Sequence, residues 1–444
     1  GSEAFGDSSK TPFVQNSTPT SSLMRIINSH TAKMLEAIMV GDFNTVIKKS
    51  NDISKAGNAI IRMFFPEGKQ VDQWFSEVGK DPDDPEAVKS MKEDFERYSG
   101  VNHAFAVDNA SNALVLAVAL CKLKAGDEVI VPAYTFCSTA IAVGALGVDI
   151  VWADTDEKSW NISPKDIERK ITSRTKAIIA VHLLGMPADM PAIMEIAKKH
   201  GLKVIEDCAQ APGASINGQM CGSFGDFGCF SFQTAKNIST LGEGGILTVK
   251  SDEDAALVPG LRFVGAKAFP EGRERYWVPA MSTVDEDITG QWPFNFCIGE
   301  AQCALGSVML KRLNDINGTL IAQGDKIRAA LADTPEVTFN TIPKGYKHLH
   351  HQFVMHFEGA GGKGRDDLMD ILVNDYKIKV IVQYYPLYNF PLFEKMGFGE
   401  HDCPVLDEWW GSSFSLPWWC GIPEETIDYI VDSVKKAIEQ LKSA

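Results

Sequence analysis

Short apolar segments alternate with amphipathic segments between residues 103 and 249, and this alternation restricts the fold more than any other feature of the sequence. The candidate strands are HAFAVD (103–108), DEVIVP (127–132), DIVWAD (149–154), KAIIAV (176–181), LKVIED (202–207), FGCFSF (227–232) and GILTV (245–249). Between them, apolar residues recur with helical spacing at 111–123, 138–146 and 190–200. This pattern predicts an α/β domain with a mostly parallel, seven-stranded sheet and helices on both faces.

The regions on either side of this pattern differ in character. Residues 1–80 begin with a tail rich in Ser, Thr and Pro and continue with apolar residues at helical spacing, so we expect an N-terminal helical extension there. The large domain is expected to occupy 81–312. From 313 to 444 the pattern changes to helix, a few strands and further helices, which predicts a smaller C-terminal α+β domain. A chain of 444 residues is long enough for this division.

The net charge and the cysteines indicate which classes of partner and which cellular compartment to expect. A formal net charge of −15 disfavours nucleic acids and anionic membranes as partners. The nine cysteines are scattered and form no CxxC pair, which is typical of a protein of the reducing cytoplasm. The uncharged run at 129–148 is long enough to suggest a membrane span, but Pro132, Gly144 and Gly147 favour a strand, a loop and a buried helix. We therefore expect a soluble, cytoplasmic protein whose partners are small molecules or copies of itself.

One lysine stands out in FGCFSFQTAKNISTLGEGG (227–245). Lys236 lies in a polar loop after a strand, with no charged neighbour before Glu243. In most proteins such a lysine is simply solvated. In a parallel α/β sheet, however, ligands bind at the carboxyl ends of the strands. A lysine held in a dry pocket has a lowered pKa and readily forms a Schiff base.

Two further segments end strands with polar residues. In VDNASNAL (107–114), Asn109 or Ser111 begins a helix, whose exposed amides could bind a phosphate or simply be capped. In VIEDCAQAPGA (204–214), Glu206 and Asp207 end an apolar strand. A carboxylate there could hold a proton on a buried heteroaromatic nitrogen, or cap the next helix.

Together the three segments supply what pyridoxal phosphate requires: a lysine for its aldehyde, an acid for its pyridine nitrogen and a cradle for its phosphate. The sequence therefore predicts pyridoxal phosphate as the cofactor. Lys236 would move protons as general acid and base, and Asp207 would keep the ring electron-withdrawing.

The same segments resemble the DegT-type sugar aminotransferases, a pyridoxal phosphate family that aminates keto sugars. The resemblance covers about residues 93–440. It is carried by the ordered segments EDFERYSGVNHAFAVDNASNAL, VIVPAYTFCSTA, VIEDCAQAPGA, FSFQTAKNISTLGEGG, FNFCIGEAQCALG and SFSLPWWCGIPEE. It implies the aspartate aminotransferase-like fold (fold type I) and a homodimer with shared active sites. It also implies an amino acid donor, L-glutamate, and a keto or aldehyde sugar acceptor.

The resemblance also implies roles for individual residues. Lys236 and Asp207 are catalytic in this comparison. The other expected cofactor contacts are the phosphate ligands Ala110, Ser111 and Ser231, the ring-stacking Phe136, Gln210 near the ring hydroxyl, and Asn295, which would reach the phosphate of the neighbouring subunit.

Several positions depart from the family pattern. Gln233 stands where a histidine is common before the lysine, Cys297 where an arginine is common, and Tyr388 where another histidine is common. Gln233 and Tyr388 are thus candidate substrate contacts. The N-terminal extension and the FQTAKN loop are most similar to members that make 8-amino-3,8-dideoxy-manno-octulosonate from 8-oxo-Kdo for lipopolysaccharide. A nucleotide-linked keto-deoxysugar is the alternative acceptor.

Two motifs suggest other cofactors. GAGGKG (359–364) has the spacing of a dinucleotide fingerprint between the strand-like QFVMHFE and a helix, but the following strand-like KIKVIVQ ends in Gln383 instead of an acid. We expect a hairpin or helix-entry loop there. HLHHQFVMH (348–356) gathers four histidines. As a strand it would put His351 on the face opposite His348 and His350, with no acidic or cysteine ligand nearby, so we expect no metal site.

Three competing functions remain open from the sequence. A sugar dehydratase of the same fold would replace the lysine with histidine, so Lys236 counts against it. A non-catalytic, regulatory relative would show no turnover with any amino donor. A nicotinamide enzyme built on 359–364 would bind that cofactor and would not be yellow.

Overall fold

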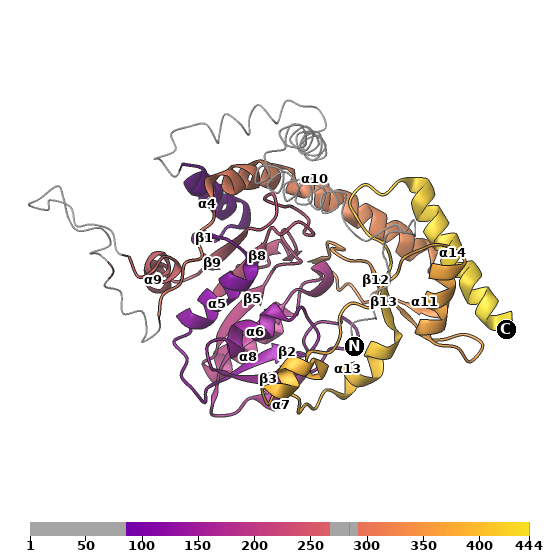
Figure 1. Ribbon diagram of the computed structural model, residues 1–444, viewed down its shortest axis with the longest axis horizontal. Helices are drawn as coiled ribbons and strands as arrows, with labels where there is room; N and C mark the ends of the chain where they lie inside the picture. Colours follow the sequence, from indigo (N-terminus) through magenta and orange to yellow (C-terminus); the bar gives the residue numbers. More distant parts are fainter. Residues whose placement is uncertain (1–85, 267–283, 285–291, 444) are drawn as a thin grey trace, which may run out of the picture.

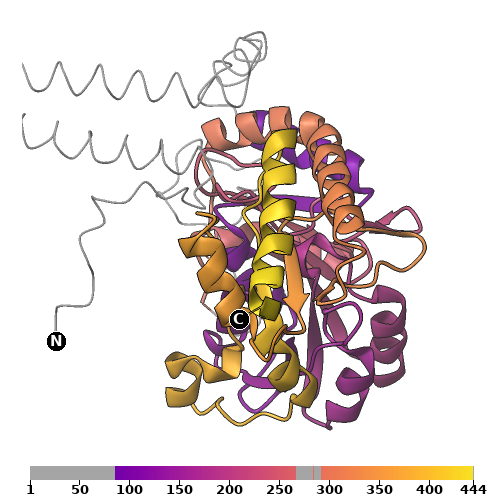
Figure 2. The same cartoon turned by 90° about the vertical axis from the view of Figure 1, so that its right-hand side faces the viewer.

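The computed structural model describes residues 86–266, 284 and 292–443, so the predicted extension at 1–80 lies outside the described residues. A large sheet with its helices forms one part of the molecule, and a smaller part containing α11 and α14 lies beside it (Figures 1 and 2). The long helix α10 (Glu300–Ala330) runs along both parts.

The large sheet has seven strands in the order β1-β9-β8-β5-β4-β2-β3. Their bounds are β1 (His103–Val107), β2 (Glu128–Pro132), β3 (Asp149–Ala153), β4 (Thr175–Val181), β5 (Lys203–Asp207), β8 (Phe227–Ser231) and β9 (Gly245–Val249). From β8 to β3 all neighbours are parallel, whereas β9 is antiparallel to both β8 and β1. The predicted seven-stranded, mostly parallel sheet is confirmed.

Helices cover both faces of this sheet, as predicted. Val129 and Val131 of β2 join a buried cluster that includes residues of α5, α6 and α9, whereas Ile130 between them joins a cluster with α7 and α8. This alternation follows from the two-residue period of a strand, which sends successive side chains to opposite faces. The helices are α5 (Ala110–Leu120), α6 (Ser138–Gly144), α7 (Pro164–Lys170), α8 (Met190–His200) and α9 (Asp252–Arg262), with the 3-10 turn η1 (Leu183–Gly185).

The helices α4 (Glu86–Ser99) and the first half of α10 cover the β1-β9-β8 end of the sheet, on the face that carries Phe230 and Ile246. Met91 and Phe95 of α4 pack with Leu305 and Met309 of α10 and with Phe230 of β8. The second half of α10 contributes Ile327 to the core of the smaller part. The predicted boundary between residues 312 and 313 thus falls inside α10, and the division into domains stays a prediction.

The smaller part contains the antiparallel sheet β10-β12-β13, which packs against α11 and α14. Its elements are β10 (Val337–Thr338), β12 (Val354–Phe357), α11 (Arg365–Asn374), η2 (Leu387–Asn389), α12 (Pro391–Lys395), α13 (Pro404–Trp409), η3 (Trp410–Ser412), β13 (Ser413–Ser415) and α14 (Glu424–Ser443). A separate small sheet joins β11 (Tyr346–Lys347), β6 (Ser215–Ile216) and β7 (Gln219–Met220).

Two strand expectations were wrong. KIKVIVQ (377–383) forms no strand and only a single bridge, from Ile381 to Ser415. The four-histidine segment also begins outside any strand, because β12 starts only at Val354 and His350 has a positive φ of 46°. Helices α7 and α9 were not predicted from the sequence, although Ser163 and Ser251 cap them with their side chains.

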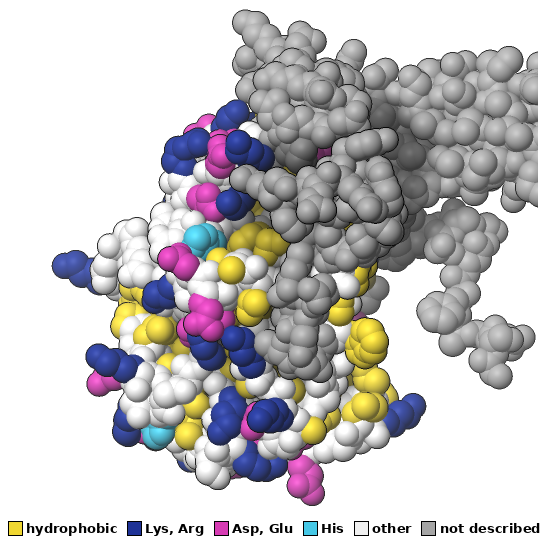
Figure 3. Space-filling view, turned by 90° about the vertical axis from the view of Figure 1, so that its left-hand side faces the viewer, with side chains coloured by type: hydrophobic (Ala, Val, Ile, Leu, Met, Phe, Trp, Pro, Cys, Tyr) yellow, Lys and Arg dark blue, Asp and Glu magenta, His cyan; other side chains and the backbone are white. Residues whose placement is uncertain are grey.

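The described surface carries charges of both signs. On the face in Figure 3, Lys and Arg side chains lie interspersed with Asp and Glu across the described surface. Residues 129–148 form β2, a loop and α6, as predicted. Within the described ranges, no helix has both the length and the apolar character needed to cross a bilayer.

Candidate active site

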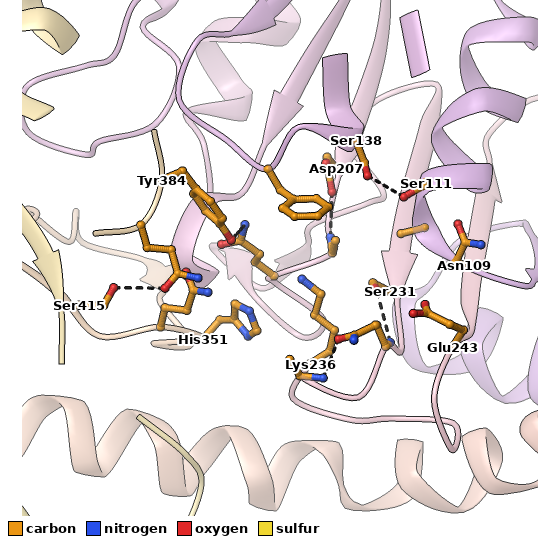
Figure 4. Close-up of a pocket in the computed structure, with 18 of the residues that line it drawn as sticks. Asn109, Ser111, Ser138, Asp207, Ser231, Lys236, Glu243, His351, Tyr384 and Ser415 are labelled. Carbon is orange, nitrogen blue, oxygen red and sulfur yellow. Dashed lines mark hydrogen bonds between the residues drawn. The ribbon is translucent and has the colours of Figure 1, made fainter. Parts of the chain in front are cut away.

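A cavity of about 860 Å³ lies at the carboxyl ends of β5 and β8 and is closed on one side by residues of the smaller part (Figure 4). The structure brings together in its lining the predicted residues Ala110, Ser111, Phe136, Asp207, Gln210, Ser231, Gln233 and Lys236. These residues come from four separate segments between 110 and 236. The shared edge of the sheet gathers them because parallel strands end at the same side.

Lys236 lies in the loop that follows β8. Its backbone N–H donates to the carbonyl of Gln233 (2.8 Å), and the Gln233 side chain accepts from the N–H of Ala235 (2.7 Å), which fixes this tight turn. The lysine side chain points into the cavity (Figure 4). Burial lowers the pKa of Lys236, and the negative charges of Asp207 and Glu243 oppose this shift. A larger fraction of the lysine is therefore a neutral, nucleophilic amine than in water.

Asp207 ends β5 and its carboxylate is buried at the opposite side of the cavity. Its Oδ2 accepts from the Thr139 hydroxyl (2.8 Å) and its Oδ1 accepts from the N–H of Ala209 (3.1 Å). Burial raises the pKa of Asp207, while these two hydrogen bonds and the charge of Lys236 lower it. A cation at this place would therefore be strongly favoured, because it would relieve the cost of a buried negative charge.

Glu206, the other candidate acid, points away from the cavity. It is fully buried, contacts Nε2 of His182 (3.0 Å), and accepts from the N–H groups of Gly222 (2.8 Å), Phe224 (2.8 Å) and Gly225 (2.7 Å). Within the described residues, neither Glu206 nor Asp207 caps a helix. Successive strand residues face opposite sides, so one acid faces the site and its neighbour anchors a turn.

His182, Glu206 and Cys208 lie close enough together to consider a metal ion. The hydrogen bonds of Glu206 and His182 already use their ligand atoms: Nδ1 of His182 accepts from the N–H of Ala188 (3.1 Å) and Nε2 faces Glu206. Burial raises the pKa of the Cys208 thiol well above its usual value, which disfavours the thiolate that a metal would need. His182 and Glu206 are thus a hydrogen-bonded structural pair beside Cys208.

A third side of the cavity, besides those of Lys236 and Asp207, is formed by the start of α5. Asn109 is the N-cap of this helix and accepts from the N–H of Asn112 (2.9 Å). The hydroxyl groups of Ser111 and Ser138 are hydrogen-bonded to each other (2.8 Å). The first strand residue of β9, Gly245, presses against this terminus, since a Cβ there would lie 3.0 Å from the Ala110 nitrogen. The helix dipole and the hydroxyl groups of Ser111 and Ser138 make this end suitable for an anion.

Gln210 and an aromatic pair line the wall between these ends. The Gln210 Oε1 accepts from the N–H of Leu184 (2.7 Å), and its Nε2 donates to the hydroxyl of Tyr384 (3.2 Å). The ring of Phe136 lies edge-on to Tyr384 at 6.2 Å, with 53 % of Phe136 exposed. A flat ring bound beside Phe136 would have an aromatic face to stack on.

Two predicted site residues lie elsewhere. Tyr388 does not line the cavity: it is buried, its hydroxyl donates to Asp407 (2.6 Å), and its ring stacks on His401 at 3.6 Å. The expectation that Tyr388 contacts substrate is therefore not supported by its position. Asn295 is exposed and is not in the cavity lining of its own chain, and its role at a neighbouring subunit stays a prediction.

The glycine-rich segment GAGGKG (359–364) forms a helix-entry loop in the smaller part, as expected. Ala360 and Lys363 are bridged, and Gly364 is the N-cap of α11. Gly361 has a φ of 57°, and a Cβ there would lie 2.1 Å from the carbonyl oxygen of Leu441, so the glycine meets a local packing need.

Several residues of the cavity wall were not predicted from the sequence. They are Glu243, His351, Gln352, Tyr384, Trp418 and Trp419. His351 and the two tryptophans lie in segments that were noted for other reasons. Only their place in the folded chain, where the smaller part meets the sheet, shows that they line the cavity.

Comparison with known proteins decides the family. The model of the DegT/DnrJ/EryC1/StrS aminotransferase family matches residues 73–435. The chain belongs to this family. The resemblance stated from the sequence is thereby confirmed, and with it a pyridoxal phosphate-dependent sugar aminotransferase is the class of enzyme. The non-catalytic and nicotinamide alternatives are set aside.

Individual relatives support this assignment. A UDP-N-acetyl-3-dehydro-alpha-D-glucosamine 3-aminotransferase of Acidithiobacillus ferrooxidans is 34% identical, with 83% of this chain and 94% of the relative covered. A GDP-perosamine synthase of Caulobacter vibrioides is 31% identical over 82% of this chain and 92% of its own. Among solved structures, DesV of S. venezuelae superposes with a TM-score of 0.73 at 27% identity, covering 87% of this chain and 97% of that one.

The cavity fits the cofactor of this family. Asp207, whose buried carboxylate has a pKa raised by burial, suits a protonated pyridine nitrogen. The α5 terminus against Gly245 suits a phosphate, and Lys236 lines the same cavity. When bound, pyridoxal phosphate supplies an aldehyde that takes up the amino group and a ring that draws electrons from the reacting carbon.

Proposed function

We propose that this aminotransferase transfers an amino group to a keto sugar that is linked to a nucleotide. The similarity to the Acidithiobacillus enzyme, over 83% of this chain, is the observation that carries this choice of acceptor. The cavity supports it, because Gln233, Gln352 and Gln383 line the wall near Lys236 and offer amide donors and acceptors for sugar hydroxyls.

The roles of the site residues are part of the proposal. Asp207 would hold the positive charge of the ring nitrogen, with Thr139 keeping its carboxylate oriented. Ala110 and Ser111 at the start of α5, with Ser231, would hold the phosphate. Phe136 would stack on the ring, and Gln210 would donate its remaining Nε2 hydrogen to the ring hydroxyl.

Lys236 would carry out the proton transfers of the reaction. Its pKa is lowered by burial, so it can take a proton from the substrate carbon and return it at a neighbouring atom. We take L-glutamate as the amino donor.

We also propose a homodimer with shared sites. Asn295 is exposed and lies away from its own cavity, and Trp292 nearby has 89 % of its surface exposed. Covering such an indole in a subunit contact would be favourable. A cytoplasmic location and the domain division at residues 80 and 312 belong to the same proposal.

The octulosonate 8-oxo-Kdo is the second acceptor to consider. Only the FQTAKN loop and the N-terminal extension of the sequence favour it. The names of the relatives favour nucleotide sugars instead.

The first test is an absorption spectrum of the full-length protein loaded with pyridoxal phosphate, before and after addition of L-glutamate. We expect a visible band of lysine-bound cofactor that fades with glutamate and does not form in Lys236→Ala. A band that glutamate leaves unchanged would reject glutamate as the donor, and a band retained by the variant would reject Lys236 as the attachment point.

The acceptor is tested by amino transfer from the glutamate-treated enzyme. UDP-N-acetyl-3-dehydro-glucosamine and 8-oxo-Kdo would be supplied separately, and return of the original band together with the aminated product would be measured. Turnover of the octulosonate alone would overturn the nucleotide-sugar proposal without affecting the assignment of Lys236.

A further inference from the structure

His351 lies in the wall of the cavity and points toward the same space as Lys236 (Figure 4). Its Nδ1 is 2.8 Å from Oδ1 of Asn237, the residue that follows the lysine. Within the described part of the chain, no hydrogen bond is formed by the other ring nitrogen, Nε2. The chemistry of His351 at the cavity therefore depends on which ring nitrogen carries the proton.

A chain of three hydrogen bonds settles this question. The carbonyl oxygen of Pro212 can only accept, so the Asn317 group that faces it at 2.8 Å must be the Nδ2 amide donor. Oδ1 of Asn317 is then the acceptor for Nδ2 of Asn237, at 2.8 Å. Oδ1 of Asn237 in turn faces the imidazole and accepts. Each amide orientation is thus determined by the one before it, starting from a backbone carbonyl.

The surrounding residues pack tightly against this chain of hydrogen bonds. Asn317 is fully buried on α10. Gly213, with a φ of 95°, leaves room for it, because a Cβ at this glycine would lie 2.6 Å from Nδ2 of Asn317. A buried asparagine with both amide ends occupied cannot rotate without leaving buried groups unpaired, which costs about 1–3 kcal/mol. The direction of the chain is therefore fixed in the folded protein.

We propose that Asn317 and Asn237 are positioning residues that hold His351 as the tautomer with its proton on Nδ1. Nε2 then presents a lone pair to the cavity and accepts a hydrogen bond from the amine of Lys236. This inference rests on the proposed role of Lys236 as the reacting amine.

The tautomer matters for the nucleophile. A neutral amine that donates one N–H to Nε2 keeps its own lone pair free and directed away from the imidazole, toward the position of the reacting carbon. The opposite tautomer would aim an N–H at that lone pair and block it. Burial and the charge of Lys236 keep the pKa of His351 well below its usual value, so the ring remains a neutral acceptor.

The direct test is nitrogen-15 NMR of the full-length protein labelled at histidine, without and with pyridoxal phosphate. The His351 signals are assigned by their loss in His351→Gln. We expect Nδ1 to show the protonated type of shift and Nε2 the unprotonated type. In Asn317→Leu this preference should be lost, because the Asn237 amide is then free to turn.

A kinetic measurement separates this role from a structural one. In the half-reaction with L-glutamate, Asn317→Leu should lower kcat about tenfold, as expected for a misaligned nucleophile, with KM little changed. Asn340→Leu serves as the control: Asn340 is also buried, but it is outside the cavity lining and bonds Arg328. It should leave both the tautomer and kcat unchanged.

If Asn317→Leu does not fold, Asn237→Leu replaces it, since Asn237 is only partly buried and the same loss is expected. A protonated Nε2 in the wild-type protein would overturn the proposal. So would an unchanged tautomer in both leucine variants. The NMR result stands independently of glutamate turnover, so a failure of the proposed function and a failure of this inference can be told apart.

Discussion

The Thr139 hydroxyl donates a 2.8 Å hydrogen bond to Oδ2 of Asp207, and both groups are buried. Thr139 lies in the first turn of α6 and Asp207 at the end of β5, so the contact connects the helix that carries the Phe136 loop to the acid of the cavity. The hydrogen bond lowers the pKa of Asp207 against the opposing effect of burial. It helps to keep a carboxylate charged where a ring nitrogen would bind.

Removal of this hydroxyl should weaken binding of the cofactor. In Thr139→Val the charged carboxylate loses a hydrogen bond, which is worth about 1.5–3 kcal/mol. We therefore expect the affinity for pyridoxal phosphate to fall by a factor of about ten or more. Titration of the apoprotein followed by absorbance measures this. Thr175→Val is the matched control, because Thr175 is also buried but its hydroxyl donates to Glu128 (3.2 Å). Equal affinity for the two variants would contradict the role given to Thr139.

The phosphate end should be sensitive to a single methyl group. In Gly245→Ala the new Cβ would lie 2.7 Å from the Phe230 carbonyl oxygen and 2.8 Å from the Asn109 carbonyl carbon, so β9 or the start of α5 must move. We expect the loss of most of the cofactor affinity, measured by the same titration. Gly318→Ala on α10 is the control, since a Cβ there meets nothing within 4 Å. An unchanged affinity in Gly245→Ala would place the phosphate elsewhere.

The strands of the large sheet were predictable because each one is short, apolar and bounded by polar residues. KIKVIVQ (377–383) has the same apolar pattern, yet its end is held by side chains instead of a neighbouring strand. The hydroxyl of Tyr134 accepts from the N–H of Tyr384 (2.8 Å) and donates to the carbonyl of Gln383. Such contacts between residues about 250 positions apart have no local signal in the sequence.

The site residues also fall into those that could be predicted from the sequence and those that could not. Lys236 and Asp207 were recognisable because Asp207 ends β5 and Lys236 lies in the loop after β8, at the edge of the sheet that brings the two together. His351 was not, because it comes from the smaller part and faces the cavity through a turn in which His350 has a positive φ. Glu206 and Asp207 are adjacent in sequence, and only the pleat of β5 decides which one faces the cavity.

Glu206 should contribute to the stability of the folded protein and not directly to the catalysed reaction. Its carboxylate accepts three backbone N–H groups from the turn at 222–225, and Glu206→Gln would turn an amide donor toward donors. We expect a loss of about 1–3 kcal/mol in the free energy of unfolding. Denaturant unfolding of the full chain measures it, with exposed Glu157→Gln as control. An unchanged unfolding midpoint would show that the turn is held by other contacts.

The buried histidines of the smaller part should make the protein sensitive to acid. Burial lowers the pKa of His356 to about 3, and that of His348 also to about 3. In the unfolded chain a histidine titrates near pH 6.5. Below that pH the unfolded state binds protons that the folded state does not. Each such histidine therefore contributes stability that is fully present above about pH 6.5 and falls by up to about 1.4 kcal/mol per pH unit toward the folded pKa.

His356 allows this effect to be isolated. Its ring lies between those of Trp160 and Trp409, with ring centroids 4.4 and 4.2 Å away, respectively. Its Nε2 is buried and has no hydrogen-bond partner among the described residues. In His356→Phe an aromatic ring remains but the titrating group is gone, so the slope of unfolding free energy against pH between about 6.5 and 4.5 should decrease by up to about 1.4 kcal/mol per unit. Denaturant unfolding at a series of pH values measures the slope. His103→Phe is the control, because His103 is partly exposed and pairs with Asp252. If His356→Phe keeps the wild-type slope, His356 is protonated in the folded protein, and the pH dependence must come from other groups.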